Sequence, residues 1–173
     1  MSQKPNKYGG GALTNINGLH FEQTTSLDEA LTTAGYTVID SIIYKDNEKI
    51  GMSVPKEKLY KKFLIPREIH YKNYNSKKWL PDEAFINFRT ETAYIIEKKF
   101  QNTPGSVDEK LPNCHFKKME YEKLFFPLSI NVEFIYILND WFKNPKYKDT
   151  LEYIEKVGCY YFYNKIPLEI LSL

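Results

Sequence analysis

Two neighbouring apolar segments restrict the fold more than any other feature of this sequence. Residues 84–89 and 92–101 are rich in apolar and β-branched residues, and only a short polar stretch separates them. Segments joined in this way predict a β-hairpin. The second segment ends in Glu97-Lys98-Lys99, although strands avoid charge where they are buried. The charged triplet therefore indicates that this end of the hairpin does more than fill a core.

The pleat of the strand assigns the charged side chains to two faces. Glu97, Lys99 and Gln101 share one face, and Lys98 lies on the other. If the hairpin is symmetric, Asp82 lies across from Glu97 on the neighbouring strand, at the open end. We therefore expect two carboxylates and an ammonium group to converge there.

This set of side chains predicts chemistry on phosphate. Two carboxylates, here Asp82 and Glu97, can share a hard cation such as Mg²⁺, which prefers oxygen ligands and keeps several waters. A nearby lysine can orient such a water and stabilise negative charge in the transition state. Metal-dependent phosphodiester hydrolysis is one interpretation, and a structural ion pair at a sheet end is the other. A second triplet, Asp108-Glu109-Lys110, lies at an expected helix start, where acids interact favourably with the helix dipole.

The formal net charge of +2 conceals an uneven distribution. Residues 56–79 carry eight bases and two acids, whereas acids slightly outnumber bases in the rest of the chain. Cations can contact phosphate, and aromatic rings can stack on bases. The candidate DNA-binding residues of this stretch are Lys61, Lys62, Arg67, Lys72, Lys77, Lys78, Tyr71 and Tyr74. The alternative is a solvated surface with a few buried rings.

The pattern of the remaining chain predicts an α/β fold. Helices are expected over residues 14–34 with a new start at Ser26, and over 56–63, 106–111, 115–125 and 147–157; further strands are expected over 36–44, 132–138 and 159–163. This order favours a central mixed β-sheet flanked by helices. Residues 1–13 are expected to form a flexible tail, and residues 14–173 a single domain.

Composition excludes several other classes. The cysteines, Cys114 and Cys159, and the three histidines lack the spacing of a structural zinc site, so reduced thiols are expected. No apolar run approaches the roughly 18 residues of a membrane span, and the N-terminal residues lack the apolar core of a signal peptide. We therefore expect a cytoplasmic protein with no membrane partner.

The motif formed by Pro81-Asp82 and Glu97-Lys98-Lys99 resembles that of the PD-(D/E)xK nuclease superfamily, and within it the type II restriction endonucleases. Residues 105–111 and 136–142 also look like stretches common in such enzymes. The resemblance implies a restriction-endonuclease-like core and Mg²⁺-dependent cleavage of double-stranded DNA. By position, Asp82 and Glu97 would be metal ligands, and Lys99 would position the attacking water.

The resemblance has further implications for the site and for partners. Many family members carry an extra acid on the first helix; Glu22 is the best match, with a solvated helix glutamate as the alternative. Gln101 could bond to the phosphate or to a metal water, or could merely finish its strand. Cleavage of both strands usually requires a twofold dimer or a partner subunit. Two rival functions are a non-catalytic DNA-binding module on the same scaffold and a resolvase or repair nuclease of the superfamily.

Overall fold

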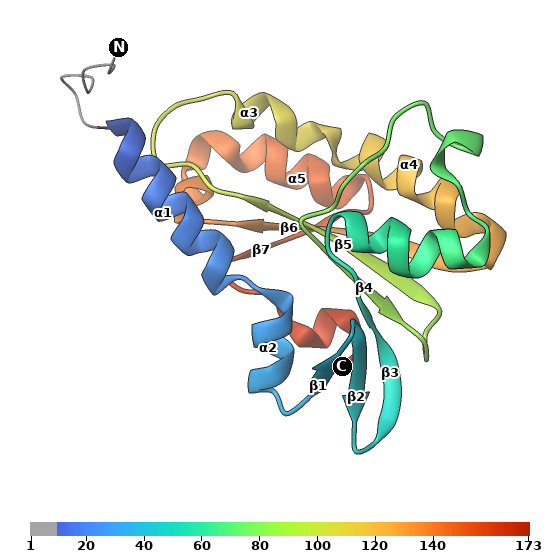
Figure 1. Ribbon diagram of the computed structural model, residues 1–173. Helices are drawn as coiled ribbons and strands as arrows, with labels where there is room; N and C mark the ends of the chain where they lie inside the picture. Colours follow the sequence, from blue (N-terminus) through green and yellow to red (C-terminus); the bar gives the residue numbers. More distant parts are fainter. Residues whose placement is uncertain (1–9) are drawn as a thin grey trace, which may run out of the picture.

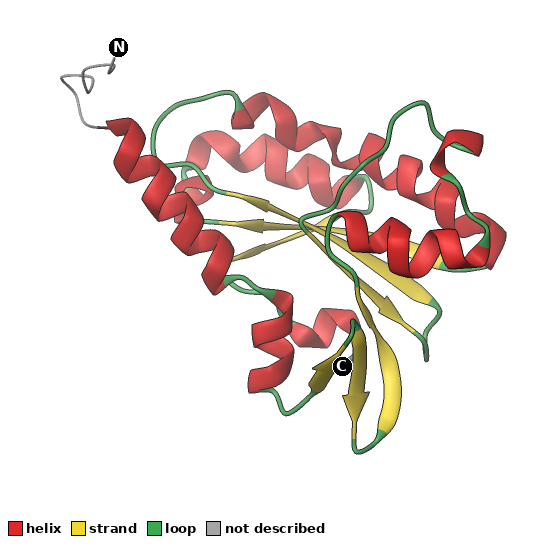
Figure 2. Ribbon diagram, viewed as in Figure 1, coloured by secondary structure: helices red, strands yellow, loops and turns green. Residues whose placement is uncertain are grey.

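A single mixed sheet of seven strands forms the centre of the computed structural model, which describes residues 10–173 (Figures 1 and 2). In spatial order the strands are β1 (Thr37–Ile39), β2 (Ile42–Lys45), β3 (Glu48–Ser53), β4 (Glu83–Asn87), β5 (Thr92–Lys99), β6 (Asn131–Leu138) and β7 (Tyr160–Tyr163). Neighbours from β1 to β5 are antiparallel, whereas β5, β6 and β7 are parallel. The expected α/β fold with a mixed sheet is confirmed.

Helices cover both faces of this sheet (Figure 2). They are α1 (Gly10–Thr24), α2 (Leu27–Thr33), α3 (Val107–Lys110), α4 (Cys114–Phe125) and α5 (Lys148–Lys156), with short 3₁₀ and π turns between elements. On one face Phe63 packs against Phe125 of α4, with ring centroids 5.8 Å apart. On the other face Phe21 of α1 and Leu31 of α2 are buried. The sheet thus separates two apolar cores.

The break between the first two helices agrees with the expected cap. The Ser26 side chain accepts a hydrogen bond from the backbone N–H of Glu29 at 3.4 Å, and α2 begins at the next residue. Gly35 follows α2 with a φ of +82°, which suits a glycine that ends a helix. Helix α1 begins at Gly10, so part of the expected tail is helical; residues 1–9 lie outside the described residues.

The single strand expected over residues 36–44 is wrong. The chain turns at Asp40-Ser41, giving β1 and β2, and again at Asp46-Asn47, giving β3. All four turn residues have positive φ, a conformation that two-residue hairpins require and that Asp and Asn tolerate. The two-residue turn at Asp40-Ser41 therefore interrupts the run of β-branched residues that predicted one continuous strand.

The short helix expected over residues 56–63 has other bounds. Residues Leu59–Leu64 form a π turn that continues as a 3₁₀ turn through Pro66, and Glu68 ends it with a left-handed conformation. Pro66 is tolerated because it lies at the start of the 3₁₀ turn, where an N–H needs no partner. Ser106 precedes α3 but makes no capping bond.

The β4–β5 hairpin has the expected register. Glu83 pairs with Ile96, and Asn87 pairs with Thr92, so one further step places Asp82 opposite Glu97. The Asn87 side chain closes the loop by accepting bonds from two backbone N–H groups of the turn. The strand pair is held by burial of its middle residues and by its closed loop.

Within the described residues, every helix is too short or too polar to cross a membrane.

The close approach of β3 to β4 generates a stability prediction. A Cβ at Gly51 would overlap the backbone carbonyl oxygen of Ile86 and lie 2.8 Å from a ring carbon of Phe85. Because that oxygen belongs to the sheet, it has no room to move aside. We expect Gly51→Ala to lower the free energy of unfolding by about 2–3 kcal/mol, measured by urea denaturation.

The matched control is Gly105→Ala, where the nearest atoms lie 3.9 Å from the added carbon. That change should alter stability by less than about 0.5 kcal/mol. If Gly51→Ala and Gly105→Ala changed the free energy of unfolding equally, that result would contradict the close approach of β3 to β4 at Gly51.

Candidate functional site

At the open end of the β4–β5 hairpin, the strand register places Asp82 opposite Glu97. Asp82 is half-buried, and its Oδ2 accepts a hydrogen bond from the backbone N–H of Lys98 at 2.8 Å. This bond ties the acid before β4 to the strand that carries Glu97. Asp82 therefore reaches its position through the hairpin register rather than through contacts of its own loop.

Glu97 lies at the centre of a group of charges. Only 6% of it is exposed, and its Oε2 accepts bonds from Lys99 Nζ at 3.0 Å and Lys117 Nζ at 2.7 Å. Burial opposes ionisation, but the two ammonium groups outweigh it and hold the pKa of Glu97 below its ordinary value. Glu97 is therefore an anion at neutral pH, and Lys99 lies beside it as expected from the strand alternation.

Helix α4 contributes residues that the sequence did not assign to the site. Lys117 and Tyr121 are four residues apart, so they project from one side of α4. Tyr121 is buried, its hydroxyl has no partner within residues 10–173, and burial together with the charges of Glu97 and Asp82 raises its pKa. The only sequence signal was this spacing, which alone does not tell a site residue from a core residue.

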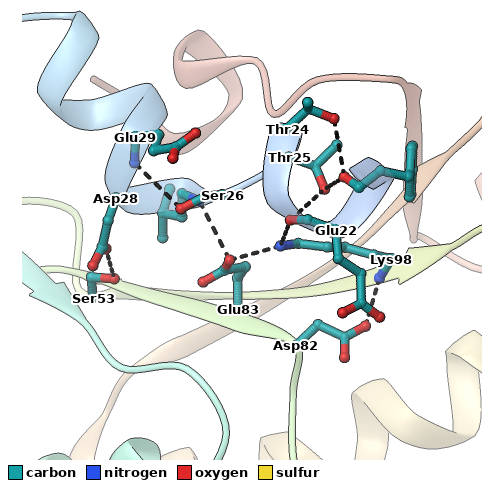
Figure 3. Close-up of polar contacts among 12 residues, drawn as sticks. Glu22, Thr24, Thr25, Ser26, Asp28, Glu29, Ser53, Asp82, Glu83 and Lys98 are labelled. Atoms are coloured by element: carbon teal, nitrogen blue, oxygen red, sulfur yellow. Dashed lines mark hydrogen bonds and ion pairs between the residues drawn. The ribbon is translucent and has the colours of Figure 1, made fainter. Parts of the chain in front are cut away.

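The opposite face of the hairpin carries a second ion pair (Figure 3). Lys98 Nζ lies 2.8 Å from Glu83 Oε1 and also donates to the backbone oxygen of Glu22 on α1. Burial raises the pKa of Glu83 despite this lysine. Lys98 thus joins α1 to the hairpin, a role that the motif alone did not predict.

A surface hollow of about 380 Å³ lies at the end of the hairpin beside this ion pair, and its lining includes Glu22, Asp82, Glu83 and Lys98. Figure 3 shows the Glu22 carboxylate extending toward Asp82. Glu22 is exposed, and the structure places no three acidic, histidine or cysteine side chains of residues 10–173 close enough to hold one metal ion. Glu22 therefore lies at the rim of a hollow that Asp82 also lines.

The donor set of Asp82 and Glu97 fits a hard divalent cation. Each carboxylate has one oxygen held by the protein, and no hydrogen bond within the described chain reaches Asp82 Oδ1 or Glu97 Oε1. Two free carboxylate oxygens suit a cation that takes one or two protein ligands and fills its shell with water and substrate phosphate. The flanking lysines suit an anionic substrate.

The candidate DNA-binding residues lie between β3 and β4 in several environments. Lys61 and Lys72 are exposed and form no ion pair with a described residue, whereas Lys62 pairs with Asp40 and Lys78 with Glu57. The remaining four have aromatic or surface contacts: Arg67 lies over Phe63, Lys77 over Trp79, Tyr71 packs edge-on against Tyr60, and Tyr74 is 36% exposed. The stretch is thus partly core and partly cationic surface.

Comparison with known families agrees with this geometry. A family model described as PD-(D/E)XK nuclease superfamily domain matches residues 15–125, well over half of the chain. The match runs from α1 through α4 and includes the β4–β5 hairpin. Neither a curated protein nor a solved structure matches the chain.

The charges around Glu97 generate a pH prediction. Because its pKa is lowered in the folded state, its stabilising contribution is present above the ordinary glutamate pKa of about 4.3 and is lost as pH falls through the lowered value. We expect Glu97→Gln to lower the free energy of unfolding by about 2 kcal/mol at pH 7 and by progressively less below about pH 4. Urea denaturation at several pH values measures this.

The control is Glu122→Gln on the exposed side of α4. Its effect should stay within about 0.5 kcal/mol at every pH. If the loss of unfolding free energy in Glu97→Gln did not vary with pH, that result would contradict the stabilisation of Glu97 by its ion pairs.

Proposed function

The chain belongs to the PD-(D/E)XK nuclease superfamily, and on that premise we propose that it is a Mg²⁺-dependent endodeoxyribonuclease for double-stranded DNA, similar to a type II restriction enzyme or its cleavage subunit. The observation that carries the proposal is the pairing of Asp82 with Glu97 beside Lys99. A buried ion pair of purely structural purpose would not need a second carboxylate with a free oxygen at the same point. We propose that the activity is cytoplasmic.

Each residue of the site has a distinct task in this proposal. Asp82 and Glu97 would hold the cation, which when bound supplies charge neutralisation at the phosphate. Lys99, fixed 3.0 Å from Glu97, orients the attacking water and donates to the phosphate oxygens. Lys117 keeps Glu97 ionised and adds positive charge at the phosphate. All these groups are in place before substrate binds, so little reorganisation is needed.

The basic stretch supports DNA as the substrate because it leads directly into the site. Tyr60 donates a hydrogen bond to the backbone oxygen of Trp79 at 2.5 Å, three residues before Asp82. This bond holds the turn that contains Tyr60 to the segment that precedes Asp82, and Lys56 lines the same surface hollow as Asp82. Cutting both strands of a duplex needs two such sites, so we propose that the active form is a homodimer or contains a partner subunit.

Loss of Lys99 should remove most of the activity. We expect Lys99→Ala to cut supercoiled plasmid in Mg²⁺ about 100- to 1,000-fold more slowly than wild type, because the water loses its positioning group. Initial rates on an agarose gel measure this. Lys110→Ala, an exposed lysine of the second triplet, should cut at the wild-type rate.

A Lys99→Ala protein as fast as wild type would overturn the mechanism. The rival functions give different results with the wild-type protein. A binding module would retain plasmid without cutting it, whereas a resolvase or repair nuclease would prefer branched DNA or DNA ends.

The exposed cations of the basic stretch should account for part of the affinity for DNA. We expect Lys61→Ala and Lys72→Ala each to weaken duplex binding and to reduce the slope of log K against log salt by about 1, since each removes one phosphate contact. Fluorescence anisotropy in Ca²⁺ at several salt concentrations measures the slope. Lys156→Ala on α5 is the control and should leave the slope unchanged. If Lys61→Ala and Lys72→Ala also left the slope unchanged, the stretch would not be part of the DNA interface.

A further inference from the structure

Gln101 is held in place by more bonds than a residue that merely finishes a strand requires. It follows β5 by two residues and is only 5% exposed. Its backbone N–H donates to Asn139 Oδ1 at 3.1 Å, and Asn139 Nδ2 donates to its backbone oxygen at 2.7 Å. One asparagine side chain thus clamps both sides of the Gln101 peptide.

The side chain of Gln101 is held as well. Its Nε2 donates to Asp108 Oδ1 at 3.3 Å. An ionised carboxylate only accepts hydrogen bonds, so Asp108 selects the NH₂ end of the amide and directs Oε1 elsewhere. That Oε1 is buried and has no partner within residues 10–173. A buried acceptor without a donor costs free energy, which a bound molecule that donates to it would recover.

Asp108 itself is fixed by a chain of side chains. Tyr147 Oη donates to Asp108 Oδ1 at 2.6 Å and accepts from Trp141 Nε1 at 2.7 Å, while Lys146 Nζ lies 3.3 Å from Oδ2. The Tyr147 bond and then the Lys146 contacts hold the pKa of Asp108 below its ordinary value. Asp108 is therefore an ionised acceptor at neutral pH, so it can bond only to the NH₂ end of the Gln101 amide.

These contacts add a second role to Asp108-Glu109-Lys110. Asp108 and Glu109 lie in the first turn of α3, as expected for acids at a helix start, although Ser106 makes no capping bond. Asp108 also bridges the end of β5 to the segment before α5. A helix-start role does not explain this bridge.

We propose that Asp108 is a positioning residue that holds the Gln101 amide so that Oε1 accepts a hydrogen bond from the attacking water. This inference rests on the proposed function, because the water belongs to the hydrolysis of DNA. Gln101 and Lys99 then bind the water from the same strand end, one as acceptor and one as donor. Without Asp108 the amide can rotate by half a turn and present a donor where an acceptor is needed.

The first measurement needs no activity. In ¹⁵N-labelled full-length protein, the Gln101 side-chain NH₂ protons should exchange slowly with solvent, because they are buried and bonded to Asp108. Asp108→Asn, which keeps the shape but no longer selects one end of the amide, should accelerate this exchange about tenfold or more. Unchanged exchange would overturn the positioning role.

The second measurement is a double-mutant cycle on plasmid cleavage. We expect Asp108→Asn and Gln101→Ala each to lower kcat about tenfold with KM unchanged, and the double variant to match Gln101→Ala within about twofold. Tyr147→Phe, which removes one bond to Asp108, should give a smaller loss in kcat. The exposed Glu109→Gln is the matched control and should behave as wild type.

The outcomes distinguish this inference from the proposed function. The wild-type protein can cut plasmid while the losses in kcat caused by Asp108→Asn and Gln101→Ala multiply in the double variant. That result would overturn the coupling between the two residues and leave the nuclease proposal standing. A wild-type protein that neither cuts nor binds duplex DNA in Mg²⁺ would overturn the proposed function and this inference with it. Thermal unfolding of each variant shows whether a loss in kcat reflects loss of the fold.

Discussion

The antiparallel register of β4 against β5 is the constraint on which the site depends. Because Glu83 pairs with Ile96, the residue before β4 lies opposite the residue after Ile96, and these two residues are acids. A slip of one residue would move every side chain of one strand to the other face. The apolar residues between the loop and the charged end prevent such a slip, since each has a buried position on its own face. The same packing that stabilises the sheet therefore aligns the two carboxylates.

The charged end of the hairpin is compatible with folding because its charges are paired on both faces. Glu97 accepts from Lys99 and Lys117 on the α4 side, and Lys98 pairs with Glu83 on the α1 side. Isolated buried charges would be very costly, whereas pairs with good geometry recover much of that cost. Both lysines bind the same oxygen of Glu97, Oε2, and leave Oε1 free. The ion pairs that compensate the buried charge of Glu97 therefore also leave Oε1 available to bind a cation.

Much of this site follows from sequence because the hairpin is local. Strand alternation and a symmetric turn were enough to place Asp82, Glu97 and Lys99 together. Lys117 and Asp108 were missed because they come from helices that cross the sheet, and no local pattern tells which side of a helix faces a strand end. The strands around Asp40 and Asp46 were missed for another reason: two-residue turns with positive φ can interrupt a β-branched run without glycine or proline.

Digestion of a defined supercoiled plasmid by the wild-type protein tests the central claim most directly. The account predicts discrete fragments in Mg²⁺, with cut ends that map to fixed positions, and no cutting when EDTA replaces the metal. A smear of fragments in Mg²⁺ would contradict sequence-specific cleavage, but the protein would still be a nuclease. Intact plasmid in Mg²⁺, or equal cutting in EDTA, would contradict the assignment of Asp82 and Glu97 as ligands of a catalytic cation.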